Sequence, residues 1–111
     1  MRKAIVGRWV AIRLAGYGLT EKPPVELSHL PQLHVLDLSD NFIKFSLCGI
    51  GAADNLEELN LFSTGLDCFV GVEDLEDTAI VSLILTMNNI NEPIPDVFWR
   101  LESLQELSVS L

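Results

Sequence analysis

The stretch Leu33-His34-Val35-Leu36-Asp37-Leu38-Ser39-Asp40-Asn41-Phe42-Ile43 decides the fold, because its spacing returns four more times along the chain. Apolar residues stand at its first, fourth and sixth positions, and an asparagine stands at the ninth. The apolar frame starts at Trp9, Leu33, Leu56, Ile80 and Leu104, and the step from Leu33 to Leu56 is shorter than the others by a single residue. A near-constant period of this length is typical of small units stacked side by side.

Each repeat carries the signature of one short strand with one buried face. The apolar residues at the fourth and sixth positions alternate with polar ones, which is the period-two pattern of a strand. The connections between successive segments are far longer than a hairpin turn, so the strands must run parallel to one another. We expect strands at Ala11–Leu14, Val35–Leu38, Glu58–Leu61, Ser82–Leu85 and Glu106–Val109.

Asn41 and Asn88 follow their strands at one fixed position of the repeat, where the chain must turn away from the sheet. An asparagine side chain can satisfy both backbone donors and backbone acceptors at such a turn. Thr64 stands at this position in the third copy and can supply part of that bonding, whereas Tyr17 in the first copy cannot. The first repeat is therefore expected to be irregular, as end units often are.

The whole pattern, Leu-x-x-Leu-x-Leu-x-x-Asn-x-Leu with its near-constant period, resembles that of the leucine-rich repeat family. The resemblance implies an α/β solenoid, in which the repeats form a right-handed superhelix. A short parallel β-sheet would line its concave face, and 3-10 or helical turns would form its convex face. The resemblance also implies recognition of a protein or peptide by the concave sheet, although fold alone does not name the ligand.

Three segments are similar to the plant-type, receptor-like subclass of that family. Residues 94–104 match its Ile-Pro pair followed by a short helix, residues 23–30 match it more loosely, and residues 7–14 are similar to a first repeat. In the expected helical turn, Phe98 takes the inward position. Trp99 then either covers the edge of the core or is exposed, and cover is favoured because it is the usual fate of a large aromatic side chain.

The repeat also divides the chain. We expect a partial N-terminal cap at residues 1–8 and a repeat array at residues 9–111, with units 9–32, 33–55, 56–79, 80–103 and a partial unit 104–111. The array stops inside a strand that carries Leu107 and Val109, and an uncovered apolar edge is a pairing hazard. The sequence therefore predicts either a piece of a longer array or self-association through this C-terminal edge.

The charge distribution opposes nucleic acid as a partner. The net charge is −9, and residues 45–99 hold ten carboxylates with no lysine, arginine or histidine. Binding to nucleic acid or anionic lipid needs clustered lysine and arginine. No stretch approaches the ~20 apolar residues of a membrane helix, and no signal peptide is recognisable. A cytoplasmic location is expected if the chain is complete, and an extracellular one if it belongs to a receptor-like protein.

Neither a cofactor nor a metal site is predicted. Cys48 and Cys68 lie at different positions of adjacent repeats, so buried free thiols are favoured over a disulfide, which stays open. The acidic run Glu73–Asp77 lacks the glycine and the regular oxygen spacing of a calcium loop, and we interpret it as solvated. His29 and His34 have no nucleophile at a matching position, so catalysis is not expected.

The outward positions of the strands form the candidate ligand-binding surface. An acidic group (Asp37, Asp40, Glu57, Glu58) and an apolar group (Phe62, Ile84, Met87) result. Binding energy concentrates in apolar anchors ringed by polar groups, so the expected partner is a basic protein or peptide with an apolar anchor. The candidate ligand-binding residues are Arg13, Asp37, Asp40, Glu58, Asn60, Phe62, Ile84 and Met87.

Two functions compete. The leading hypothesis is a non-catalytic recognition module, and the alternative is a structural spacer or truncated remnant of a receptor-like protein that binds nothing. Five strands about 4.8 Å apart provide a face of roughly a few hundred Å², below the ~800 Å² per partner of a stable interface. Alone, this chain is expected to bind weakly.

Overall fold

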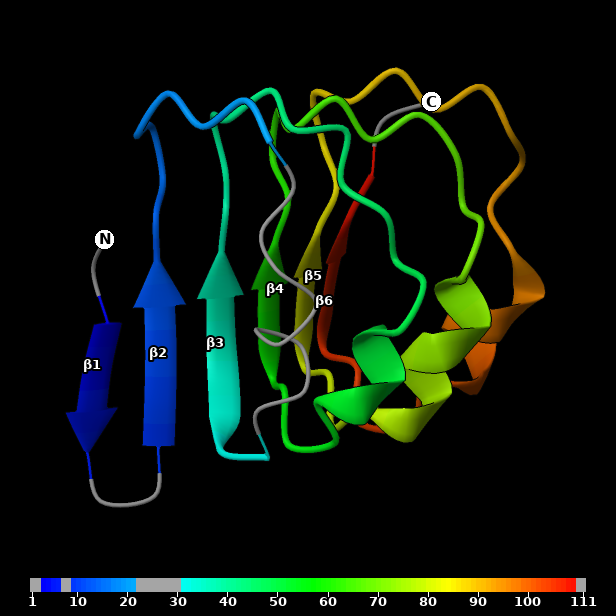
Figure 1. Cartoon of the computed structure of the whole chain (residues 1–111). Helices are drawn as coiled ribbons and strands as arrows, with labels where there is room; N and C mark the ends of the chain where they lie inside the picture. The colour runs from blue at the N-terminus through cyan, green and yellow to red at the C-terminus, as the bar shows by residue number, and fades with distance from the viewer. Residues whose placement is uncertain (1–2, 7–8, 22–30, 110–111) are drawn as a thin grey trace.

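The computed structural model describes residues 3–6, 9–21 and 31–109 and contains one six-stranded sheet (Figure 1). Its strands lie side by side in chain order: β1 (Lys3–Val6), β2 (Trp9–Arg13), β3 (Leu33–Asp37), β4 (Glu58–Asn60), β5 (Ser82–Ile84) and β6 (Glu106–Ser108). Strands β2 to β6 are parallel, whereas β1 pairs antiparallel with β2. The predicted run of five parallel strands is confirmed.

The register of the sheet reproduces the spacing of the sequence repeat. Arg13 pairs with Asp37, Asp37 with Asn60, Asn60 with Ile84, and Ile84 with Ser108. These steps equal the ones that separate the apolar frames, and the shorter step falls between the same two repeats. Each strand ends one residue before its predicted end, because the ladder gives way to the turn that follows.

Strand β1 is an addition that the repeat did not predict. Residues 1–8 were expected to act as a partial cap, and within them Lys3–Val6 forms the outer strand beside β2. An antiparallel partner needs only a short connection, and β1 and β2 are close neighbours in the sequence. The expected match at residues 23–30 lies outside the described residues.

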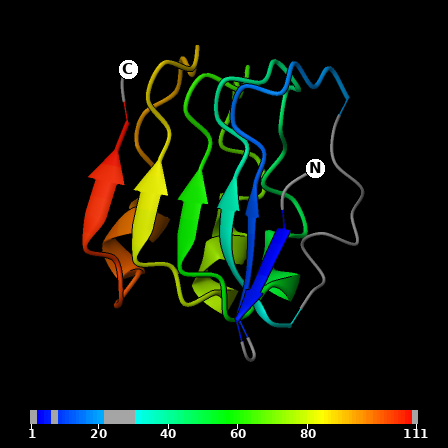
Figure 2. The ribbon, with the colours of Figure 1, turned by 90° about the vertical axis from the view of Figure 1, so that its left-hand side faces the viewer.

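Short 3-10 helices lie on one side of the sheet, at η2 (Ile50–Ala52), η3 (Val72–Asp77) and η4 (Asp96–Arg100). Figure 2 shows strands β2 to β6 side by side with these helical turns behind them. The last of them confirms the short helix expected after Ile94 and Pro95. Among the described residues, no helix has the length and apolar character needed to span a membrane.

The core lies between the sheet and the 3-10 helices. The side chains of the fourth and sixth repeat positions are buried from β2 through β5: Ile12, Leu14, Leu36, Leu38, Leu59, Leu61, Leu83 and Leu85. Phe69 and Phe98 meet edge to face between neighbouring repeats, with ring centroids 5.7 Å apart. At β6 the corresponding Leu107 and Val109 are half-buried, since the described residues place a strand on one side of β6 only.

The inward position of Phe98 is confirmed, but the expected cover by Trp99 is wrong. Trp99 is 72% exposed, whereas Phe98 is 2% exposed. A 3-10 helix has three residues per turn, so Trp99 lies on the same side as the exposed Asp96, whereas Val97 and Phe98 face inward.

The two cysteines are free, and the expectation that both are buried is wrong. Cys48 is exposed and Cys68 is half-buried. The backbone of Cys48 lies against Gly71, where an added Cβ would come within 2.5 Å of the Cys48 nitrogen. Gly71 also has φ +88°, so the close approach and the backbone conformation both favour glycine there.

Candidate recognition surface

The exposed face of the sheet is built by the residues that alternate with the buried leucines. In each strand the residue between the two buried positions points away from the core. This column runs Arg13, Asp37, Asn60, Ile84 and Ser108 across β2 to β6, and all five side chains are exposed or half-buried. We call this column and its immediate flanks the exposed sheet face.

A second column beside it runs through Val35, Glu58, Ser82 and Glu106. Glu58 and Glu106 are exposed, and the Ser82 hydroxyl donates a 2.7 Å hydrogen bond to Glu106 Oε1. Val35, which the alternation places outward, is buried between β2 and β4 and offers no surface to a ligand.

Two of the candidate side chains are held by their own turns. Asp37 Oδ1 accepts hydrogen bonds from the Ser39 backbone N–H at 3.0 Å and from the Ser39 hydroxyl at 2.7 Å. Asn60 Oδ1 accepts one from the Phe62 backbone N–H at 3.0 Å. These local hydrogen bonds fix the orientation of both side chains, because the residue two positions later donates to one oxygen of each.

Asp40 and Met87 lie beyond the ends of their strands, in the turns. Their φ angles are +58° and +60°, and Ser63 and Gly16 take the same left-handed conformation in the other two repeats. The Asp40 N–H donates to the Phe62 carbonyl at 2.9 Å, so this conformation belongs to the junction between repeats. Both side chains are exposed at the rim of the face, not on the strands.

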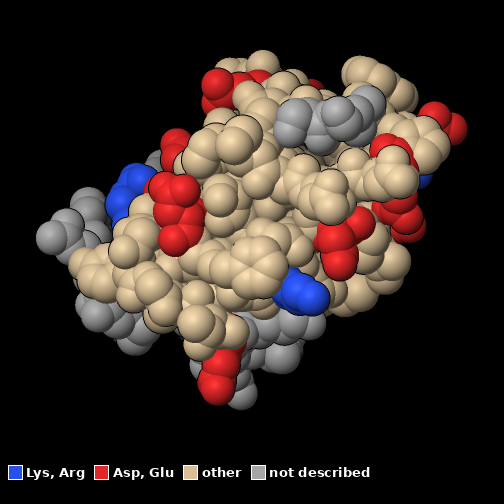
Figure 3. All heavy atoms as spheres, turned by 90° about the horizontal axis from the view of Figure 1, so that it is seen from above, with Lys and Arg blue, Asp and Glu red and all other residues tan. Residues whose placement is uncertain are grey.

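The three apolar candidate residues differ in how much of their side chains is exposed. Phe62 and Ile84 are half-buried, while Met87 is 68% exposed. Seen from the end where the strands finish, most of the surface is uncharged, with separate carboxylate groups and sparse cations (Figure 3). The acidic residues Asp37, Asp40 and Glu58 belong to β3, the turn after it and β4, whereas the apolar residues Phe62, Ile84 and Met87 belong to β5 and to the turns after β4 and β5.

One hollow lies on the exposed sheet face. It has a volume of about 420 Å³ and is lined by Arg13, Ala15, Gly16, Tyr17 and Asp37. Tyr17 is 50% exposed, whereas its place in the repeat predicts only an irregular turn there. Its position at the end of the strand that carries Arg13 is the signal that could have placed it in the surface.

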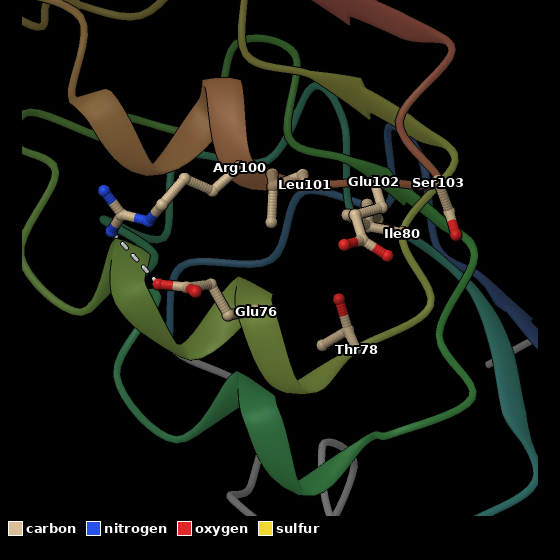
Figure 4. A pocket seen from close by; sticks show the side chains of 7 residues that line it. All are labelled: Glu76, Thr78, Ile80, Arg100, Leu101, Glu102 and Ser103. Carbon is tan, nitrogen blue, oxygen red and sulfur yellow. Dashed lines mark hydrogen bonds and ion pairs between the residues drawn. The ribbon is translucent and has the colours of Figure 1, made fainter.

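A second hollow of about 350 Å³ lies on the side of the 3-10 helices (Figure 4). Glu76 of η3 and Arg100 of η4 form an ion pair of 3.1 Å at its margin. The Thr78 hydroxyl donates to the Leu75 carbonyl at 2.7 Å. Within the acidic run, Glu76 is therefore engaged in an ion pair. The described residues contain no group of three potential metal ligands.

Comparison with models of protein families, with curated proteins and with solved structures gave no match.

Proposed function

We propose that the chain is a leucine-rich repeat solenoid of the plant-type, receptor-like kind and that it acts as a non-catalytic recognition module. Its exposed sheet face binds a segment of a protein or peptide. The family resemblance of the sequence supports the fold part of this proposal, and the repeat-by-repeat register of the ladder agrees with it.

The observation that carries the functional part is the contrast between the two faces of the strands. The buried positions of β2 to β5 are leucine or isoleucine throughout, whereas the outward column holds a cation, an acid, an amide and an isoleucine: Arg13, Asp37, Asn60 and Ile84. A face that only keeps the protein soluble has no need of half-exposed Phe62 and Ile84 beside acids. Apolar anchors ringed by polar groups are typical of binding surfaces.

The favoured partner is a basic segment with one apolar anchor. Asp37, Asp40 and Glu58 supply negative charge, and Phe62, Ile84 and Met87 supply the apolar contact. The face is small, so a dissociation constant in the micromolar range or weaker is expected.

A peptide-display selection on the immobilised chain, followed by calorimetry, tests the proposal. Phe62→Ala and Ile84→Ala should each weaken a selected peptide about tenfold, because truncated anchors lose their contact area. Trp99→Ala, an exposed aromatic on the opposite side, is the matched control and should leave affinity unchanged. Thermal unfolding of each variant separates lost binding from lost structure.

The structural spacer is the second candidate, and one observation favours it. Oδ1 of Asp37 and Oδ1 of Asn60 are already engaged by their own turns. A spacer predicts that selection yields no peptide, or that Phe62→Ala and Ile84→Ala leave affinity unchanged. Self-association through β6 stays a separate prediction, and light scattering of the isolated chain tests it.

A further inference from the structure

Among the described residues Arg13 has no ion-pair partner, although the protein carries a net charge of −9. Within the described ranges the ion pair is Glu76–Arg100, on the other side of the molecule. Arg13 stands directly opposite Asp37 in the parallel ladder, where a pair between opposite charges would ordinarily form. The exposed guanidinium makes neither an ion pair nor a hydrogen bond to any described residue.

The two hydrogen bonds from Ser39 to Asp37 explain why Asp37 does not form an ion pair with Arg13. Asp37 Oδ1 accepts both the N–H and the hydroxyl of Ser39, so the carboxylate is drawn along its own strand toward the turn. Such bonds to a carboxylate are stronger than those between neutral groups, and they compete with the bond to a flexible arginine. Arg13 is left facing the hollow that it lines with Tyr17 and Gly16.

We propose that this hollow is a subsite for the side-chain carboxylate of a bound peptide segment. The inference rests on the proposed function and adds an acidic residue to the basic and apolar ones expected of the ligand. Arg13 donates to the carboxylate, and the ring of Tyr17 contacts the side chain's methylene groups. Asp37 Oδ2 accepts no hydrogen bond from any described residue and receives a cation of the same segment.

The distance between neighbouring strands sets the order of the acidic, basic and apolar side chains along the ligand. Adjacent strands are about 4.8 Å apart, so the distance from Arg13 to Ile84 is about 14 Å. An extended peptide advances about 6.8 Å between alternate side chains, which point to one face. A segment lying across the strands therefore places an acid at its first position, a base at its third and an apolar residue at its fifth.

A side chain rather than a chain terminus is the favoured source of the carboxylate. The backbone of β1 continues the sheet on one side of Arg13, and β3 to β5 continue it on the other. A bound segment thus has sheet on both sides of the hollow and need not end there.

The test uses the whole chain and a blocked peptide, acetyl-Glu-Ser-Lys-Ser-Phe-amide, titrated by NMR. The expected result is that replacing the peptide's Glu by Gln weakens binding about three- to fivefold, the range for exposed ion pairs. Arg13→Gln should cost the same factor, and the two changes together should cost no more than either alone. Arg100→Gln is the control and should have no effect.

Two further probes sharpen the result. Acetyl-Lys-Ser-Glu-Ser-Phe-amide has the same composition and should bind more weakly, since it sets a cation opposite Arg13. Acetyl-phenylalanine carries only a terminal carboxylate. If it perturbs Gly16 and Tyr17 more than the first peptide does, the side-chain assignment is overturned.

Additive losses, equal affinities for the Glu and Gln peptides, or no binding at millimolar concentration would also overturn the subsite. In those cases the proposed function still stands if selected peptides depend on Phe62 and Ile84. Conversely, non-additive losses at Arg13, without dependence on Phe62 or Ile84, would support the subsite and refute the wider face.

Discussion

The turns after β3 and β5 join neighbouring repeats differently from the turn after β4. After β3, Asn41 Nδ2 donates to the Leu14 carbonyl at 2.7 Å, and Asn41 Oδ1 accepts the Leu19 N–H at 2.9 Å. After β5, Asn88 Nδ2 likewise donates to the Leu61 carbonyl at 2.7 Å. Each asparagine side chain thus reaches from its own repeat to the preceding one.

Thr64 occupies the same position after β4, but its hydroxyl donates to the Leu61 carbonyl of its own repeat at 3.0 Å, with a longer contact of 3.4 Å to Asn88 Oδ1 of the following repeat, and makes none to the preceding repeat among the described residues. The preceding repeat is joined instead by backbone: the Thr64 carbonyl accepts the N–H groups of Ile43 at 3.1 Å and Lys44 at 2.9 Å. Lys44 takes a left-handed φ of +50°, whereas Thr20 and Asp67, which stand at the same repeat position ahead of the two asparagine junctions, do not.

The same hydrogen-bonded junction between two repeats can therefore be made by a long side chain or by a bent backbone. Threonine is too short to reach the preceding repeat, so the chain of that repeat bends toward it. The bend falls in the repeat of residues 33–55, the one that is shorter than the other full repeats by a single residue. The predicted bonding by asparagine and the partial bonding by threonine are both confirmed.

The largest expected effect comes from removing an asparagine. Asn41→Ala should lower the free energy of unfolding by about 3 kcal/mol, because several buried backbone groups lose their partners at once. Asn88→Ala should cost somewhat less, since Asn88 is half-buried and water can reach part of the gap. Urea denaturation measures both. The neighbouring, exposed Asn89→Ala is the control and should stay within about 0.5 kcal/mol.

Removing the threonine hydroxyl should have a smaller effect. Thr64→Val keeps the shape and should cost about 1 kcal/mol, since the Leu61 carbonyl retains its bond from Asn88. The same denaturation measurement applies. A loss as large as that of Asn41→Ala would show that the hydroxyl, and not the backbone, joins these repeats.

The smallest effect is expected at the bend itself. Lys44→Gly should stabilise the protein by about 0.5 kcal/mol, because glycine removes the strain of the left-handed conformation and part of that gain is lost to chain entropy. The reverse change, Gly16→Ala at φ +69°, should destabilise by about 1 kcal/mol with no steric clash, as the added Cβ meets open space. If neither substitution changed the free energy of unfolding, the left-handed backbone at Lys44 would not distinguish the threonine junction energetically from the asparagine junctions.

Much of the candidate surface could be predicted, because side chains alternate along a strand. That alternation placed Arg13, Asp37, Asn60 and Ile84 on one column. It failed where the strand had already ended, and Asp40 and Met87 belong to left-handed turns. It also gave no sign that Asp37 bonds to Ser39 rather than to Arg13, which has no ion-pair partner in the described part of the chain, because that choice depends on competing partners in three dimensions.

The amino-acid order alone determined the parallel strands, their register and the leucine columns, since each follows from a spacing that a short apolar repeat imposes. Only the tertiary structure decided the side-chain bonds between neighbouring repeats, the exposure of Trp99 and Cys48, and the antiparallel edge strand β1. These depend on which groups of neighbouring repeats come within hydrogen-bonding reach once the strands pair, and no local sequence pattern encodes the distances between repeats.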